Sequence, residues 1–254
     1  MIKTFSFLWV LPIALCMTAG LSGRPDIKNQ NSAASKGFAV IELFTSEGCS
    51  SCPPADEIAL EFAKQYKTRV YILGFHVDYW DRLGWKDGFS DPGYTKRQEQ
   101  YAGLFNLSSI YTPQVIINGK NQFVGSERNK IEGAIQKELG TTPNSDLEIT
   151  AKAKDLKSVL VSYNAKSLDG LLINIALVQS HAETFVKRGE NTGRHLRHIN
   201  VVRNFKTFPA GKSNTGEAIL LLPPGLTKDS CSIIVYTQDS RNMHILSTAG
   251  ADIQ

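Results

Sequence analysis

Two cysteines spaced as Cys49-x-x-Cys52 stand between an apolar run, residues 38–44, and an amphipathic run, residues 54–66. A pair with this spacing, in a turn from a strand into a helix, is typical of a dithiol that can close to a disulfide and reopen. The first turn of a helix also presents free N–H groups and the positive end of the helix dipole. Both stabilise a thiolate, so the pattern favours a reactive Cys49 at an accessible helix tip.

Other interpretations of the pair are half of a zinc site, a static disulfide or a chance spacing. A structural zinc ion usually takes four ligands, often from two such pairs. The only other cysteines, Cys16 and Cys231, do not form a second pair. Cys231 begins a strand-like run, residues 231–236, where we expect a buried, unreactive thiol. Redox chemistry is therefore favoured over a metal site or a static bridge.

The N-terminus has the pattern of a secretory signal peptide over residues 1–20: a basic start, an apolar run and small residues for cleavage. It predicts a secreted or periplasmic protein, in a compartment where disulfides persist. The apolar run is too short for a membrane anchor, and no later segment is long enough to span a bilayer. Lipid attachment through Cys16 is a less favoured alternative, because Leu15 does not suit the cleavage site. Residues 21–36 are expected to be a flexible leader.

Charge gives no sign of a nucleic-acid partner. The net charge is +4, and the lysines and arginines are scattered along the chain. A solvated surface explains this distribution better than a nucleic-acid interface.

The strand expected at residues 38–44 is interrupted by Glu42. A buried acid costs free energy unless it is paired or neutral. Glu42 therefore lies either at an exposed edge or beneath the cysteines as a proton acceptor. After the cysteines, Pro53 and Pro54 suit the first turn of a helix. Asp56 falls in that turn, where its charge suits the helix dipole.

A second strand is expected over residues 70–77, and His76 near its end is interpreted as a structural histidine in preference to a metal ligand. In the loop that follows, Trp80 and Trp85 either line a substrate groove or cover the core. Asp91 is expected to begin the next helix.

The stretch around Thr112-Pro113 is the second informative one. A proline that opens a strand is a candidate for a cis peptide bond. Asn118-Gly119 then predicts a hairpin turn. A closing helix is expected to be capped by Ser126 and to end at Gly140.

After a linker at residues 141–145, alternating strands predict a small all-β antiparallel sandwich over residues 146–254. Its seven strands are expected at residues 147–151, 158–164, 171–179, 196–204, 218–222, 232–237 and 243–247. The polar run at residues 188–198 contains His195 and His198, which could bind a metal with His181. A solvated hairpin loop is favoured, and its best functional interpretation is that it packs over the cysteine turn or contacts a partner.

The order of elements in residues 37–140, with the Cys49-x-x-Cys52 pair and Thr112-Pro113, resembles the thioredoxin superfamily. The resemblance implies an α/β domain, a mixed sheet flanked by helices, followed by the sandwich. It implies that Cys49 attacks and Cys52 resolves, while Thr112 and Pro113 hold a substrate backbone. Glu42 would lie near the buried acid of thioredoxins.

The sequence of residues 42–56 resembles that of an uncharacterised group of secreted bacterial thioredoxin-like proteins, known as a domain of unknown function. Two departures from thioredoxins are visible. Gly48 replaces the usual tryptophan, and Ser50-Ser51 replaces Gly-Pro. The dipeptide between the cysteines helps to tune the reduction potential, so the direction of any redox reaction stays open.

We therefore expect an exported thiol–disulfide oxidoreductase that acts on a protein or on a small thiol or disulfide and needs no cofactor. One alternative is a copper-binding protein that uses Cys49 and Cys52, with help from His76. The other is an inactive adaptor whose sandwich binds a partner.

Overall fold

The computed structural model of the chain describes residues 1–2, 37–142, 147–166, 169–211 and 213–254. The predicted signal peptide with Cys16, apart from residues 1–2, and the predicted leader up to residue 36 lie outside the described residues. Within the described ranges, no helix has both the length and the apolar character needed to cross a bilayer.

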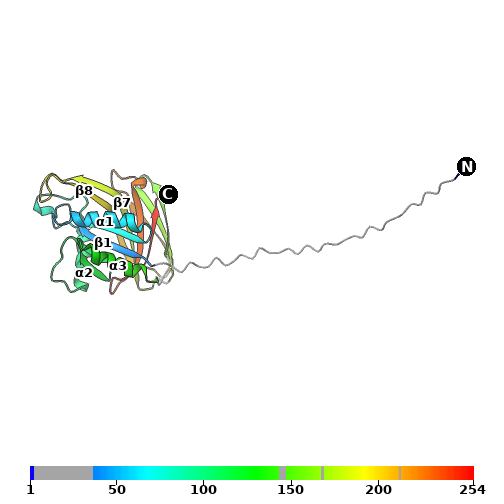
Figure 1. The fold of residues 1–254 in the computed structure, drawn as a ribbon, viewed down its shortest axis with the longest axis horizontal. Coiled ribbons are helices and arrows are strands. Elements are labelled where there is room, and N and C mark those ends of the chain that lie inside the picture. Colours follow the sequence, from blue (N-terminus) through cyan, green and yellow to red (C-terminus); the bar gives the residue numbers. More distant parts are fainter. Residues whose placement is uncertain (3–36, 143–146, 167–168, 212) are drawn as a thin grey trace. The chain divides into compact units, whose positions relative to one another are not determined.

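Most of the strands belong to one eight-stranded mixed sheet (Figure 1). β1 (Ala39–Thr45) pairs in parallel with β2 (Val70–His76) and antiparallel with β3 (Gln114–Ile117). β3 carries β4 (Asn121–Val124) at one edge of the sheet. Beyond β2, the order continues through the C-terminal strands β8 (His195–Pro209), β7 (Leu171–Phe185), β10 (Cys231–Asp239) and β11 (Ile245–Asp252).

A smaller sheet contains β5 (Leu147–Asp155), β6 (Ser158–Ala165) and β9 (Thr215–Leu221), in the order β5-β6-β9. Its apolar face packs against β7 and β10 of the large sheet. Val161 and Leu220 share this buried cluster with Ile175 and Val235.

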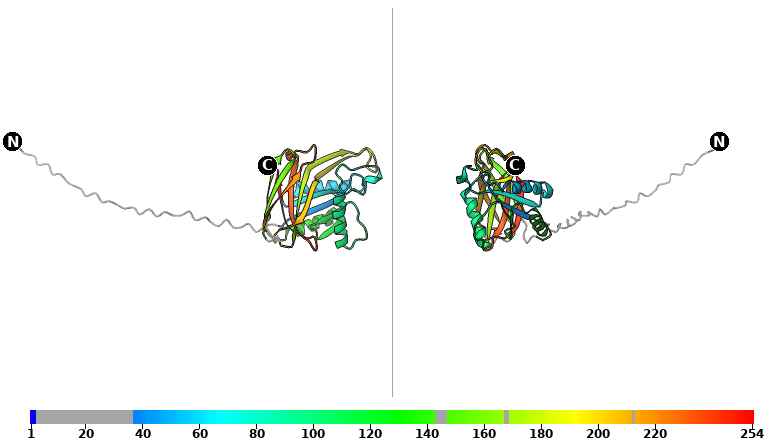
Figure 2. Two further views of the ribbon diagram at one scale, coloured as in Figure 1. Left: turned by 180° about the vertical axis from the view of Figure 1, so that it is seen from behind. Right: turned by 60° about the vertical axis from the view of Figure 1, so that its left-hand side comes forward.

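The predicted division into an α/β domain followed by a separate antiparallel sandwich is wrong. All seven C-terminal strands form close to their expected positions. Four of them, β7, β8, β10 and β11, continue the sheet that contains β1, with β2 between β8 and β1 (Figure 2). The reason is visible on β7, where Ile175 and Ala176 point to different buried clusters. A strand covered on both faces suits the middle of a large sheet, whereas a two-sheet sandwich leaves one face in solvent.

The three α-helices of the described chain cover both faces of the large sheet (Figure 1). α1 (Pro53–Tyr66) and α3 (Arg128–Leu139) pack on Ile41 and Leu43, whereas α2 (Pro92–Leu104) packs on Val40 and Phe44. Alternate residues of β1 thus face different helices, as the period of two in a strand requires.

The expected helix boundaries are mostly confirmed. Asp91 caps α2, because its carboxylate accepts a hydrogen bond from the backbone N–H of Gly93 at 2.7 Å. Gly140 ends α3 as predicted. The prediction of Ser126 as the cap of α3 is wrong by one residue, since Glu127 holds that position.

The predicted turn at Asn118-Gly119 joins β3 to β4, with φ angles of 48° and 67°. Positive φ at both positions is typical of a tight hairpin turn. A Cβ atom at Gly119 would lie 1.9 Å from the carbonyl oxygen of Met243. The backbone N–H of Ile245 donates to the Asn118 carbonyl at 2.9 Å. This turn therefore packs directly on the connection between β10 and β11.

Candidate redox site

Cys49 and Cys52 form a disulfide in the turn between β1 and α1, with their Cα atoms 5.4 Å apart. Cys52 is the N-cap residue of α1, and prolines occupy the first helical positions as expected. The carbonyl of Cys52 accepts hydrogen bonds from the N–H groups of Ala55 and Asp56 at 2.8 and 3.2 Å. The sulfur pair is thus held at the positive end of a helix.

The Thr112–Pro113 peptide bond is cis. Trp80 connects this bond to the cysteine turn. Its Nε1 donates to Oγ1 of Thr112 at 2.8 Å, and a Cβ atom at Gly48 would lie 3.1 Å from the Cβ of Trp80. Glycine at position 48 therefore leaves room for Trp80, and a tryptophan from the β2–α2 connection lies against the residue before Cys49.

The cysteine turn is covered by the β7–β8 loop, which comprises residues 186–194. Nδ2 of Asn191 donates to the carbonyl oxygens of Glu47 and Cys49 at 2.8 and 2.9 Å. The carboxylate of Glu190 accepts a hydrogen bond from the N–H of Ser50 at 3.1 Å. The interpretation that the polar run packs over the cysteine turn is therefore confirmed.

This cover changes the expected accessibility of the site. Cys49 and Cys52 are both 0% exposed, whereas Ser50 and Ser51 between them are exposed. The expectation of an accessible Cys49 is wrong for this structure, because the β7–β8 loop lies over the turn. In this structure the sulfur atoms are therefore closed to solvent.

Five buried titratable side chains contact one another in a group that we call the acid–histidine cluster: Glu47, Asp56, His76, Asp87 and His198. Nδ1 of His76 lies 2.7 Å from the carboxylate of Asp87. The same carboxylate accepts a hydrogen bond from the N–H of Glu47 at 2.9 Å. Burial raises the pKa of Asp87, but the charge and hydrogen bond of His76 outweigh burial and lower it. His76 is therefore tied into the structure beside the cysteine turn.

His198 lies between two carboxylates. Its Nε2 is 3.6 Å from Glu47 and its Nδ1 is 3.6 Å from Asp56, which are ion-pair distances slightly longer than a hydrogen bond. Among the described residues, neither nitrogen of His198 has a hydrogen-bond partner. Burial lowers the pKa of His198, but Asp56 and Glu47 outweigh burial and raise it from 6.5 to about 10. At neutral pH His198 is therefore an imidazolium.

The raised pKa predicts a pH-dependent stability. Because the folded pKa lies above the unfolded value, the stabilisation is fully present below pH 6.5 and is lost as pH rises through about 10. We expect the free energy of unfolding to fall by roughly 3–5 kcal/mol across this window, since one pKa unit corresponds to about 1.4 kcal/mol. Urea unfolding at several pH values measures it. The fall should shrink in His198→Gln and persist in His195→Gln, an exposed histidine on the same strand. Equal profiles for wild type and His198→Gln would contradict the assignment.

Glu42 lies on the α2 side of β1. Its carboxylate accepts hydrogen bonds from Nε and Nη2 of Arg97, at 3.1 and 2.6 Å, and from the hydroxyl of Tyr236 at 2.6 Å. Burial lowers the pKa of Arg97, but the charge of Glu42 outweighs it and holds the guanidinium protonated. No hydrogen bond or ion pair in the described chain joins Glu42 to either cysteine. The structure thus links the cysteine turn to Thr112 through Trp80 and places Glu42 in a separate buried ion pair.

Comparison with known proteins adds the family. The sequence profile of a family described as "Protein of unknown function (DUF1223)" matches residues 40–238. The chain belongs to DUF1223. A crystal structure of a protein from Agrobacterium tumefaciens is similar to it, with a TM-score of 0.65 and 25% identity, over 85% of this chain and 95% of that one. A domain of the outer membrane lipoprotein Omp28 from Porphyromonas gingivalis is 13% identical, with a TM-score of 0.26, over 44% of this chain and 89% of that one. No curated protein matches.

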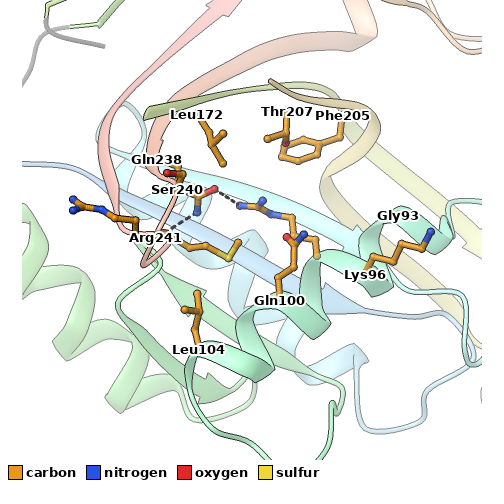
Figure 3. Close-up of a pocket in the computed structure, with 12 residues that line it drawn as sticks. Gly93, Lys96, Gln100, Leu104, Leu172, Phe205, Thr207, Gln238, Ser240 and Arg241 are labelled. Atoms are coloured by element: carbon orange, nitrogen blue, oxygen red, sulfur yellow. Dashed lines mark hydrogen bonds between the residues drawn. The ribbon is translucent and has the colours of Figure 1, made fainter. Parts of the chain in front are cut away.

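Two cavities of this DUF1223 protein lie next to the buried groups described above. One, of about 240 Å³, lies where α1 and β8 begin, and Pro53, Asp56 and Arg197 are among the residues that line it. The other, of about 490 Å³, lies between α2, β8 and the β10–β11 connection, with Gln238 and Phe205 on its wall (Figure 3). The first cavity adjoins the cysteine turn, and the second adjoins the Glu42–Arg97 pair.

Two further predictions concern cysteine and metal chemistry. Cys231 is a free, buried thiol as expected, and burial raises its pKa. Of the described residues, no group of three or more histidine, cysteine, aspartate or glutamate side chains is arranged to hold a metal ion. His181 and His195 do not join His198 in the acid–histidine cluster, since His195 pairs with Glu183 at the surface.

Sequence reasoning missed the residues that the DUF1223 fold adds to the site from far along the chain. The sequence interpretation places Asn191 only in a polar run, treats His198 as a solvated or metal-binding histidine of that run, and treats Trp80 as a loop aromatic. Asn191 is 142 residues away from Cys49, its hydrogen-bond partner. The available signal was the concentration of polar residues between two expected strands.

Proposed function

We propose that this DUF1223 protein is an exported thiol–disulfide oxidoreductase in which Cys49 and Cys52 alternate between a disulfide and a dithiol. The observation that carries the proposal is the disulfide at the N-terminus of α1, in a turn that Trp80 connects to the residue before the cis-proline. The local combination of strand, cysteine pair, helix and cis-proline also supports a relation to the thioredoxin superfamily. The predicted signal peptide supports export.

The proposed reaction is an exchange of disulfides. The Cys49 thiolate attacks one sulfur of a substrate disulfide, breaking that bond and releasing one substrate thiolate, which takes up a proton. Cys52 then attacks the mixed disulfide, re-forms the Cys49–Cys52 bond and releases the second substrate thiol. The substrate gains two electrons and the protein loses two. The reverse sequence oxidises a dithiol substrate.

Movement of the β7–β8 loop is part of this proposal, because the sulfur atoms are buried in the closed structure. Displacing Asn191 and Glu190 would uncover the turn from the side of the cavity between α1 and β8. Thr112 and Pro113 are proposed to hold the backbone of a protein substrate. Glu42 takes no part in the proposed exchange, because its carboxylate is engaged by Arg97 and Tyr236.

Trapping of the mixed disulfide tests the proposal. In Cys52→Ser, the attacking Cys49 cannot be resolved, so we expect a stable adduct with a thiol-disulfide probe such as oxidised glutathione, visible as a mass increase. Cys49→Ser should form no adduct through Cys52, because Cys52 is the resolving residue. The wild-type pair should return to a dithiol after reduction and to a disulfide after oxidation. A wild-type pair that stays oxidised in excess dithiothreitol while the protein remains folded would overturn the proposal.

The complete burial of both cysteines favours a second candidate, a static disulfide in a protein that binds a partner through another surface. In that case Cys49→Ser and Cys52→Ser would lower stability equally and form no adducts. The same mass measurements therefore separate the two candidates.

A further inference from the structure

We infer that His198, from β8, sets the equilibrium between the disulfide and dithiol forms of the Cys49–Cys52 pair. It does so by holding a positive charge between two buried carboxylates that lie on either side of the pair in the chain. This inference rests on the proposed function and adds a positioning residue to it. Its basis is the placement of Glu47, Asp56 and His198 in the acid–histidine cluster.

The two carboxylates adjoin the cysteines along the chain. Glu47 precedes Cys49 by two residues, and its backbone carbonyl shares the Asn191 amide with that of Cys49. Asp56 is in the first turn of α1, and its N–H donates to the carbonyl of Cys52. Glu47 is 1% exposed and Asp56 is 6% exposed, so water does little to screen their charges.

Neutral donors bind both carboxylates but cannot cancel their charges. Nε1 of Trp85 donates to Glu47 at 2.8 Å, and the hydroxyl of Thr45 donates to Asp56 at 3.3 Å. Oε1 of Glu47 has no hydrogen-bond partner among the described residues, and it is the atom that faces Nε2 of His198. The imidazolium of His198 is therefore the cation shared by the two acids.

The other cations that the structure describes around His198 are engaged by other groups. Its ring contacts those of His76 and Phe89, with centroids 4.8 and 5.9 Å away. His76 is engaged by Asp87 at 2.7 Å, and the guanidinium of Arg203 lies over the ring of Phe89. On α1, Glu57 is paired with Arg197. The local charge balance of Glu47 and Asp56 thus depends on His198.

The charge balance of Glu47, Asp56 and His198 affects the stability of the reduced cysteine pair. Reduction adds two electrons to the sulfur pair, and one sulfur of the reduced pair is reactive only as a thiolate. Two nearby carboxylates oppose that negative charge, whereas a nearby imidazolium favours it. The charge of His198 therefore stabilises the reduced form relative to the disulfide, and its removal should make the protein a stronger reductant.

A comparison of variants that each remove one charge tests the inference. The measured quantity is the equilibrium constant between disulfide and dithiol in glutathione buffers at pH 7, read by thiol labelling and mass. For His198→Gln we expect a shift toward the disulfide of at least about tenfold, equivalent to about 30 mV. For Glu47→Gln, which removes a negative charge, we expect a shift of opposite sign. The double variant should return close to wild type, and the surface control His195→Gln should not differ from it.

Each outcome has a separate meaning. Single variants that shift in the same direction, or by less than threefold, overturn the inference while the proposed function stands. A wild-type pair that never equilibrates with glutathione in the folded protein overturns the proposed function instead. If His198→Gln does not fold, the comparison of Glu47→Gln with wild type still decides: an unchanged constant overturns the inference, and a shift toward the dithiol supports it.

Discussion

Arg97→Met is expected to lower the free energy of unfolding by about 3–5 kcal/mol, the largest effect on stability that we predict. The substitution leaves Glu42 as a buried carboxylate without its cation, because Arg97 supplies two hydrogen bonds to it. The guanidinium also lies over the rings of Phe205 and Tyr101, at 5.0 and 5.3 Å from their centroids. Equilibrium unfolding in urea at pH 7 measures the loss.

The matched control is the double variant Glu42→Gln/Arg97→Met. It removes both charges while keeping side chains of similar size, so it should recover part of the stability lost in Arg97→Met. The difference between the variants isolates the cost of the unpaired carboxylate. If the double variant is less stable than Arg97→Met, the cost comes from lost packing and the ion-pair explanation is wrong.

Asn191→Ala is expected to speed reduction of the Cys49–Cys52 disulfide by about tenfold or more. The Asn191 amide donates two hydrogen bonds to the cysteine turn, and it is fully buried. Each bond contributes about 1 kcal/mol, so losing both raises the population of the open loop by roughly tenfold to thirtyfold. Reduction by dithiothreitol requires that open form. The rate of reduction is measured by labelling the released thiols in samples quenched at successive times.

Thr192→Ala is the control for Asn191→Ala. Thr192 belongs to the same β7–β8 loop and is exposed, and its hydroxyl donates to the carbonyl of Gly189 within the loop. Its reduction rate should remain within about twofold of wild type, because no bond to the cysteine turn is lost. Equal rates for Asn191→Ala and wild type would show that the sulfur atoms are reached by a route that does not need this loop to open.

Local features of the fold were predictable because their causes are local. The cysteine pair, the helix after Pro53 and the cis bond at Pro113 each follow from a few neighbouring residues. The turn at Asn118-Gly119 follows from the positive φ that these residues tolerate. Such features depend on sequence neighbours, so a short pattern contains the necessary information.

The assembly of the strands was not predictable in the same way. Alternation in residues 171–179 indicates a strand but does not say which strand lies next to it. β8 pairs with β2 in parallel, through Gly74 and Val201, which are far apart in the chain. The linker-like composition of residues 141–145 favoured two separate domains, although four of the strands that follow it, β7, β8, β10 and β11, join the sheet of β1–β4.

Only the part of the candidate site that is built from residues close together in the sequence could be predicted. The position of the disulfide follows from the pattern, whereas its burial follows from Asn191 in the β7–β8 loop. Asp56 was interpreted as a residue that suits the helix dipole, and the structure adds a histidine from another strand 3.6 Å from its carboxylate. A histidine in a polar run gives no sequence signal of the two acids it will meet.

The position of β8 between β7 and β2 makes the two halves of the chain inseparable. Division of the gene after the codon for Gly140 would remove the neighbour on one side of β2 and leave an unpaired row of backbone groups there. The cysteine-bearing half of this protein therefore cannot be exchanged on its own, as an independent domain can. Insertions for engineering belong in its surface connections, and any transplant has to carry both halves together.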